Sequence, residues 1–87
     1  MSKQRDALYE IEAANSAKAV CLAVMTALGR PTDFLRVTAR RVTADGHRVN
    51  VIAGGDPTTA RIAHSFFVTA DEDGAVTHSS PAVEKAY

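Results

Sequence analysis

Four arginines cluster in one stretch of the chain, and they are the residues best suited to bind a charged ligand. They are Arg36, Arg40, Arg41 and Arg48. On a twisted two-stranded ribbon such side chains can grip phosphates, and a β-ribbon can enter a nucleic-acid groove. Arginines on the wet face of a sheet also keep it soluble and protect its edges from pairing. Because the formal net charge is zero, strong nonspecific nucleic-acid binding is not expected. The solubilising role is therefore favoured over nucleic-acid contact.

Other residues that can do chemistry are not arranged for it. His47, His64 and His78 are separated by fourteen residues or more, whereas a zinc site needs closely spaced His or Cys pairs. Gly54-Gly55 lacks the spacing of a phosphate-binding loop. The carboxylates of residues 71–73 fall at a predicted turn tip, which is an ordinary place for solvated acids. We therefore expect no catalytic residue, no metal, no cofactor and no enzyme activity.

The apolar segment 17–28 is the element against which the remaining residues are expected to pack. Its apolar side chains recur at steps of three and four, which places them on one stripe of a helix. The pattern extends toward the N-terminus and predicts one long helix over about residues 3–29. Gly29 and then Pro31 form a stop signal. Asn15 and Ser16 favour N-cap positions over helix interiors, so a kink or a separate helix start there stays open.

The same segment is apolar on nearly every side, which is typical of a helix covered on more than one face. A single small sheet covers one face, so we expect Val20, Leu22 and Met25 to meet a second copy of the chain. The expected partner is therefore the chain itself, as a homodimer, or another protein. In the alternative, the sheet and the C-terminal tail wrap the helix within one monomer. Cys21 lies on the apolar stripe and is expected to be a small buried hydrophobe.

Period-two patterns predict strands at about 34–44, 47–53, 61–70 and 75–80, followed by a tail at 81–87. Asp45-Gly46 between two such runs favours a two-residue type I′ hairpin. In that register a bulge at Arg40-Arg41 is needed to turn the arginines outward. One face of the hairpin then carries Val37, Ala39, Val42, Val49 and Val51. Asp56-Pro57 could instead open a short helix through His64, so helix or strand stays open for residues 56–64. Residues 71–74 predict a turn with Gly74 in the left-handed conformation.

These patterns together predict a single α+β domain over residues 1–87. Its architecture is a long N-terminal helix packed on a three- to four-stranded antiparallel β-meander. A single cysteine suits a reducing compartment, and the apolar run is too short to span a bilayer, so we expect a cytoplasmic protein that does not enter a membrane. The leading functional hypothesis is a small non-enzymatic interaction or accessory module that associates with itself through helix 17–28. The alternative is a nucleic-acid-binding protein that uses the four arginines.

Overall fold

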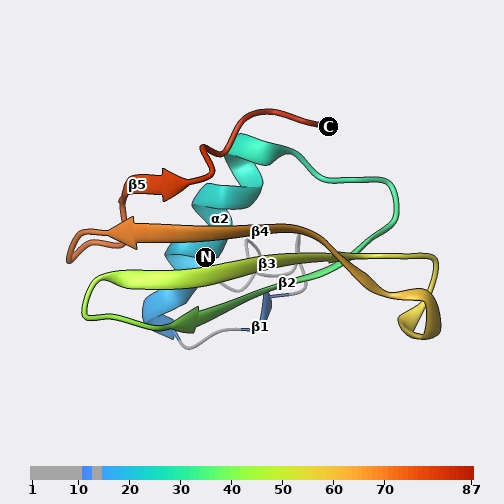
Figure 1. Cartoon of the computed structure of the whole chain (residues 1–87), viewed down its shortest axis with the longest axis horizontal. Helices are drawn as coiled ribbons and strands as arrows, with labels where there is room; N and C mark the ends of the chain where they lie inside the picture. The colour runs from blue at the N-terminus through green and yellow to red at the C-terminus, as the bar shows by residue number, and fades with distance from the viewer. Residues whose placement is uncertain (1–10, 13–14) are drawn as a thin grey trace.

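The computed structural model describes residues 11–12 and 15–87. One α-helix, α2 (Asn15–Leu28), covers one face of a mainly antiparallel sheet (Figure 1). The strands run in the order β1-β2-β3-β4-β5, with β2 to β5 antiparallel and β1 added in parallel at the edge of β2. Their bounds are β1 Ile11–Glu12, β2 Phe34–Arg41, β3 Gly46–Ala53, β4 Arg61–Ala70 and β5 Val76–Ser80. The predicted α+β class and its antiparallel meander are confirmed.

The prediction of a long helix over residues 3–29 is wrong. Helix α2 has 14 residues, and Ile11–Glu12 pair with β2 as a short strand. Residues 3–10 and 13–14 lie outside the described residues. The helix begins at Asn15, the alternative start that the sequence left open. Its C-terminus is as predicted, because Gly29 adopts a φ of 92° and donates its N–H to the Met25 carbonyl at 2.9 Å.

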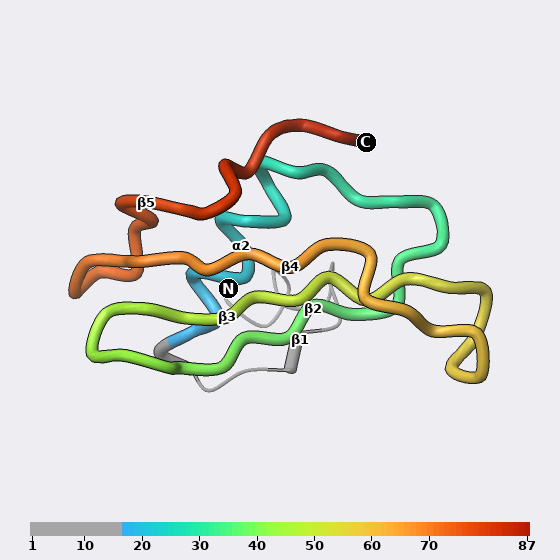
Figure 2. The backbone as a smooth tube through the Cα atoms, viewed as in Figure 1, coloured from blue at the N-terminus to red at the C-terminus, as the bar shows by residue number. Residues whose placement is uncertain are grey.

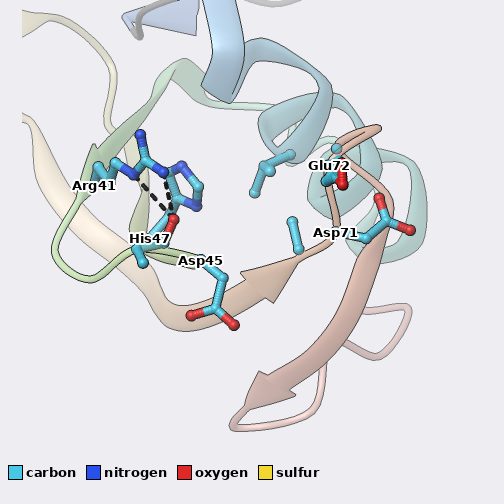
Figure 3. A pocket seen from close by; sticks show the side chains of 9 residues that line it. Arg41, Asp45, His47, Asp71 and Glu72 are labelled. Carbon is cyan, nitrogen blue, oxygen red and sulfur yellow. Dashed lines mark hydrogen bonds between the residues drawn. The ribbon is translucent and has the colours of Figure 1, made fainter.

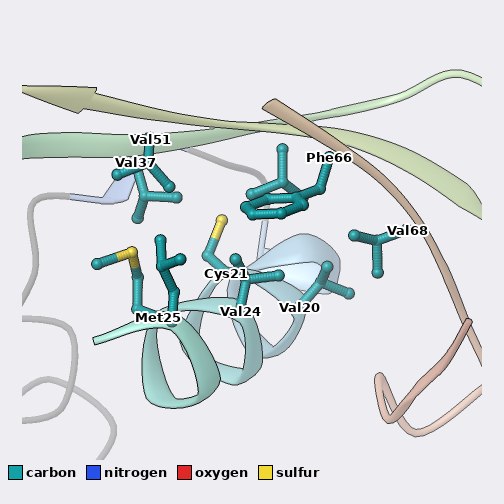
Figure 4. Packing of buried hydrophobic residues seen from close by; sticks show 10 residues of the cluster. Val20, Cys21, Val24, Met25, Val37, Val51, Phe66 and Val68 are labelled. Atoms are coloured by element: carbon teal, nitrogen blue, oxygen red, sulfur yellow. The ribbon is translucent and has the colours of Figure 1, made fainter. Parts of the chain in front are cut away.

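The core is a single layer between α2 and the sheet (Figure 4). Residues at helical spacing on α2 meet residues at alternate positions on β2, β3 and β4, as the two periods require. The helix contributes Val20, Cys21, Val24, Met25 and Leu28, and the sheet contributes Val37, Val49, Val51, Phe66 and Val68. Burying each aliphatic side chain fully is worth about 1.5–3 kcal/mol. This layer is therefore the main source of stability.

The burial of α2 corrects the predicted surface for self-association. Val20 and Met25 have no exposed surface, because both pack against the chain's own sheet. They are not available to a second copy of the chain. Leu22 is half-buried and is the member of the predicted trio that a partner could still reach.

The first hairpin differs from its prediction in loop length and register. Arg41 pairs with His47, Ala39 with Val49 and Val37 with Val51, so residues 42–46 form the loop in place of a two-residue Asp45-Gly46 turn. The register shift lies between Phe34 and Arg36, not at Arg40-Arg41. Two bonds close the longer loop, because the N–H groups of Val42 and Thr43 donate to the Gly46 carbonyl at 2.9 and 3.2 Å. Val42 is consequently 51% exposed.

The open assignment of residues 56–64 to helix or strand is settled. Residues 57–59 form a 3-10 helix and β4 follows from Arg61, so both elements are present. Asp56 caps the short helix, and its carboxylate accepts the Thr58 N–H at 2.8 Å. The hydroxyl and N–H of Thr58 lower the pKa of Asp56 below its ordinary value.

The turn at residues 71–74 is confirmed, with Gly74 at a φ of 84° and its N–H bonded to the Asp71 carbonyl at 3.0 Å.

The C-terminal tail crosses the end of α2 (Figure 2). The N–H groups of Ala86 and Tyr87 donate to the Leu28 carbonyl at 2.8 and 3.2 Å. Carbonyls in the last turn of a helix lack partners within the helix, so the tail satisfies one of them. The Tyr87 hydroxyl also lies 2.7 Å from Nε2 of His64 on β4. The tail therefore ties the helix end to the sheet.

Across residues 11–12 and 15–87, no helix combines the length and the apolar character that crossing a bilayer requires.

Burial raises the pKa of the Cys21 thiol from 9.0 to about 12, which makes stability depend on pH. Above pH 9.0 the thiol ionises in the unfolded chain but not in the folded one, so stability falls as pH rises toward the folded pKa. Between pH 7 and pH 10, we expect the wild type to lose about 1.4 kcal/mol more than Cys21→Ala in urea denaturation. An equal loss in both chains, or rapid labelling of Cys21 in native buffer, would contradict its burial.

Candidate functional site

The face of the sheet opposite α2 gathers polar and basic side chains. Val37, Val49 and Phe66 face the helix, so their neighbours along each strand point the other way. We call this surface the distal face. By strand register it carries Arg36, Thr38, Arg40, Arg48, Asn50, Ser65 and Phe67.

Two arginines of the distal face lie directly opposite each other. Arg40 on β2 pairs with Arg48 on β3, and both side chains are exposed. Like charges at directly opposed positions destabilise a sheet. Strands β2 to β5 contain no acidic residue that offsets them, and in the neighbouring strand β1 Glu12 pairs with Thr38. The pair is therefore a local concentration of positive charge that an anion would relieve.

An aromatic ring lies beside this pair. The Arg48 guanidinium is 5.9 Å from the centroid of the Phe67 ring, within the range of a cation–π contact. The ring rests against Gly46, where an added Cβ would come within 2.5 Å of the Phe67 Cζ. The Ser65 hydroxyl donates to Asn50 Oδ1 at 2.7 Å on the same surface. The distal face thus combines a half-buried ring, hydrogen-bonding groups and cations.

The structure separates the four arginines of the first hairpin. Arg36, Arg40 and Arg48 share the distal face, whereas Arg41 lies on the helix side, because it is odd-numbered in a strand whose odd residues face α2. Arg36 is half-buried. Sequence reasoning did not single out Phe67 as a functional residue. The signal that could have identified it is the strict alternation of residues 61–70, which places Phe66 on one face of the sheet and Phe67 on the other.

A hollow lies on the helix side of the sheet, between the 42–46 loop and the 71–74 turn (Figure 3). We call it the loop–turn pocket; its volume is about 450 Å³. Arg41 and His47 line one side, and Asp71 and Glu72 lie across from them. His47 is only 7% exposed. Its Nδ1 is buried without a hydrogen-bond partner in the part of the chain that the structure describes.

The structure does not bring the three histidines together. His47 lines the pocket, His64 contacts Tyr87, and His78 is exposed on β5. Among residues 11–12 and 15–87, no three His, Cys, Asp or Glu side chains are grouped so as to hold a metal ion.

Comparisons of this chain with protein-family models, with curated proteins and with solved structures found no match.

Gly46 has no room for a side chain, because an added Cβ would clash with Thr43 Oγ1 and would lie 2.5 Å from Phe67 Cζ. We expect Gly46→Ala to destabilise the fold by about 1–3 kcal/mol, in the range of overpacked sites, and Phe67→Leu to restore part of the loss in the double variant. Urea denaturation of the single and double variants measures both effects. Gly55→Ala is the matched control, because an added Cβ there meets only Thr59 Oγ1 at 3.8 Å. Equal losses at Gly46 and Gly55 would show that Phe67 does not rest on Gly46.

Proposed function

We propose that this chain is a small non-enzymatic interaction module that binds single-stranded nucleic acid across the distal face. The observation that carries the proposal is the opposed pair Arg40 and Arg48 beside the Phe67 ring. Proteins that bind single strands combine cationic side chains along the backbone with aromatic rings on which bases stack. A sheet face with aromatic residues is one platform for such recognition.

The charge distribution supports a local and modest interaction. The formal net charge is zero, so the whole molecule provides little attraction for a polyanion. The arginines nonetheless share one face, and strands β2 to β5 contain no acidic residue, although Glu12 of β1 pairs with Thr38 on β2. We therefore expect weak binding that depends strongly on salt and on these few residues.

Self-association, a protein partner and a cytoplasmic location stay predictions. Leu22 on the outer side of α2 is half-buried, and within the described part of the chain β5 is the last strand of the sheet, with no neighbour beyond it. Either element could meet a partner. The distal face is preferred as the binding surface because its side chains define the chemistry of a ligand, which Leu22 and the β5 edge do not.

Removal of the arginine pair tests the proposal. Fluorescence anisotropy of labelled single-stranded RNA and DNA, titrated at several salt concentrations, measures affinity and salt dependence. For Arg40→Gln/Arg48→Gln we expect affinity to fall at least about tenfold. The slope of log affinity against log salt should shrink by about 1.4, because each lost phosphate contact to a single strand contributes about 0.7. Phe67→Leu should weaken binding without changing this slope, since stacking releases no counterions.

Arg61→Gln/Lys85→Gln is the control of equal charge. Arg61 makes an exposed ion pair with Asp33 at 3.2 Å, and Lys85 donates to the Tyr87 carbonyl at 2.9 Å in the tail. Neither belongs to the distal face, so this variant should bind like the wild type. Equal weakening in the two double variants would point to nonspecific charge attraction, and no binding by the wild type would refute the proposal outright.

A further inference from the structure

The loop–turn pocket is built from segments far apart in the sequence. Arg41 and His47 come from the first hairpin, whereas Ala70, Glu72 and Gly74 come from the end of β4 and the following turn. A backbone bond joins the two walls, because the Ala70 N–H donates to the Asp45 carbonyl at 3.0 Å. Gly74 also packs closely on the helix, since a Cβ there would lie 2.8 Å from that of Ala19. The pocket is therefore braced by both the sheet and α2.

The charged side chains of the pocket do not neutralise one another. Asp45, Asp71 and Glu72 line the same hollow as Arg41, yet among the described residues none of them forms an ion pair with Arg41. The Asp71 carboxylate instead accepts the N–H groups of Asp73 and Ala75 at 2.9 and 3.0 Å. Within the same described part, no hydrogen bond or ion pair engages the Glu72 carboxylate. The Arg41 guanidinium and the carboxylates of the pocket thus line the same space without forming an ion pair across it.

Arg41 is oriented by the loop that it closes. Its Nε donates to the Thr43 and Ala44 carbonyls at 3.3 and 3.2 Å, and Nη2 also donates to Ala44. These bonds use one edge of the guanidinium. The edge formed by the two terminal nitrogens keeps further donors, and this fork matches the two oxygens of a carboxylate.

His47 supplies a second unsatisfied group in the same wall. Its side chain is more than nine-tenths buried, and Nδ1 has no partner among the described residues. Buried polar atoms without a partner are uncommon in native proteins. Because Nδ1 is itself covered, a ligand in the pocket would satisfy it by a small movement of the imidazole, and this penalty would then be removed.

We propose that the loop–turn pocket binds a small zwitterion, a free amino acid, with its carboxylate on Arg41 and His47 and its ammonium on Glu72. A plain anion would meet the carboxylates of the far wall, and a plain cation would meet Arg41. A molecule that carries both charges satisfies both walls. The volume of about 450 Å³ lies within the usual range for small-molecule sites, about 300–1,000 Å³. This site is independent of the distal face, because Arg40 and Arg41 lie on opposite sides of β2.

The test is a chemical-shift titration of the ¹⁵N-labelled full chain with each standard amino acid in turn, at millimolar concentration. We expect at least one to give saturable shifts at Arg41, His47, Ala70 and Gly74. Arg41→Gln should weaken that ligand at least about tenfold, as expected for the loss of a charge-assisted hydrogen bond. Glu72→Gln, at an exposed turn, should also weaken it. Arg40→Gln is the matched control, since it removes the same charge one residue away on the distal face and should leave the affinity unchanged.

Two derivatives of the best ligand test its class. The N-acetyl form lacks the ammonium and the amide form lacks the carboxylate, so each should bind at least about tenfold more weakly than the parent. No saturable shifts with any amino acid would overturn the proposal. Equal binding of a derivative and the parent would overturn it as well, as would full affinity in a folded Arg41→Gln or Glu72→Gln. Loss of nucleic-acid binding in Arg40→Gln with amino-acid binding intact would separate the two sites.

Discussion

The structure depends on the burial of one helical stripe against one face of the sheet. Val20, Val24 and Met25 recur at the spacing of a helix, whereas Val37 on β2 and Val51 on β3 lie at the alternate strand positions that face the helix. The two patterns meet in a single layer, and among residues 11–12 and 15–87 no helix lies over the other face of the sheet. The polar character of that face follows directly, because an uncovered apolar surface would be prone to association.

The alternation of side chains along each strand separates two candidate binding surfaces. Adjacent residues of a strand point to opposite faces, so Arg40 joins the distal face while Arg41 joins the pocket. A slip of β2 by one residue in the register would exchange them and would also expose Val37. The core therefore sets the location of both arginines, although neither belongs to it. Substitutions in the core are expected to disturb both candidate sites together.

Local patterns in the sequence were sufficient to place most elements. The strand limits, the stop at Gly29 and the turn at Gly74 depend on residues close together in the chain. The prediction of the first hairpin was wrong because Asp45-Gly46 is a local turn signal, whereas the register of β2 against β3 depends on residues distant in the sequence. Phe67 occupies the space beside Gly46, and Arg41 holds the loop by its carbonyls. The predicted start of the helix was wrong for a related reason. The apolar spacing continues toward the N-terminus past the Asn15-Ser16 pair, but Ile11 and Glu12 pair with β2.

The net charge of the chain says little about which surface could bind a ligand. A net charge of zero argues against binding to a polyanion only if all charges of the protein act on the ligand together. The Debye length is about 8 Å at physiological ionic strength, whereas the shortest dimension of the molecule is 21 Å. Charges on opposite sides are therefore screened from each other, and a ligand responds to the side that it contacts. A ligand at the distal face would therefore meet Arg40 and Arg48 largely without interference from the carboxylates of the 71–74 turn, which packs against the helix at Ala19. A chain with no net charge can thus present a cationic surface on one side and a mixed-charge pocket on the other.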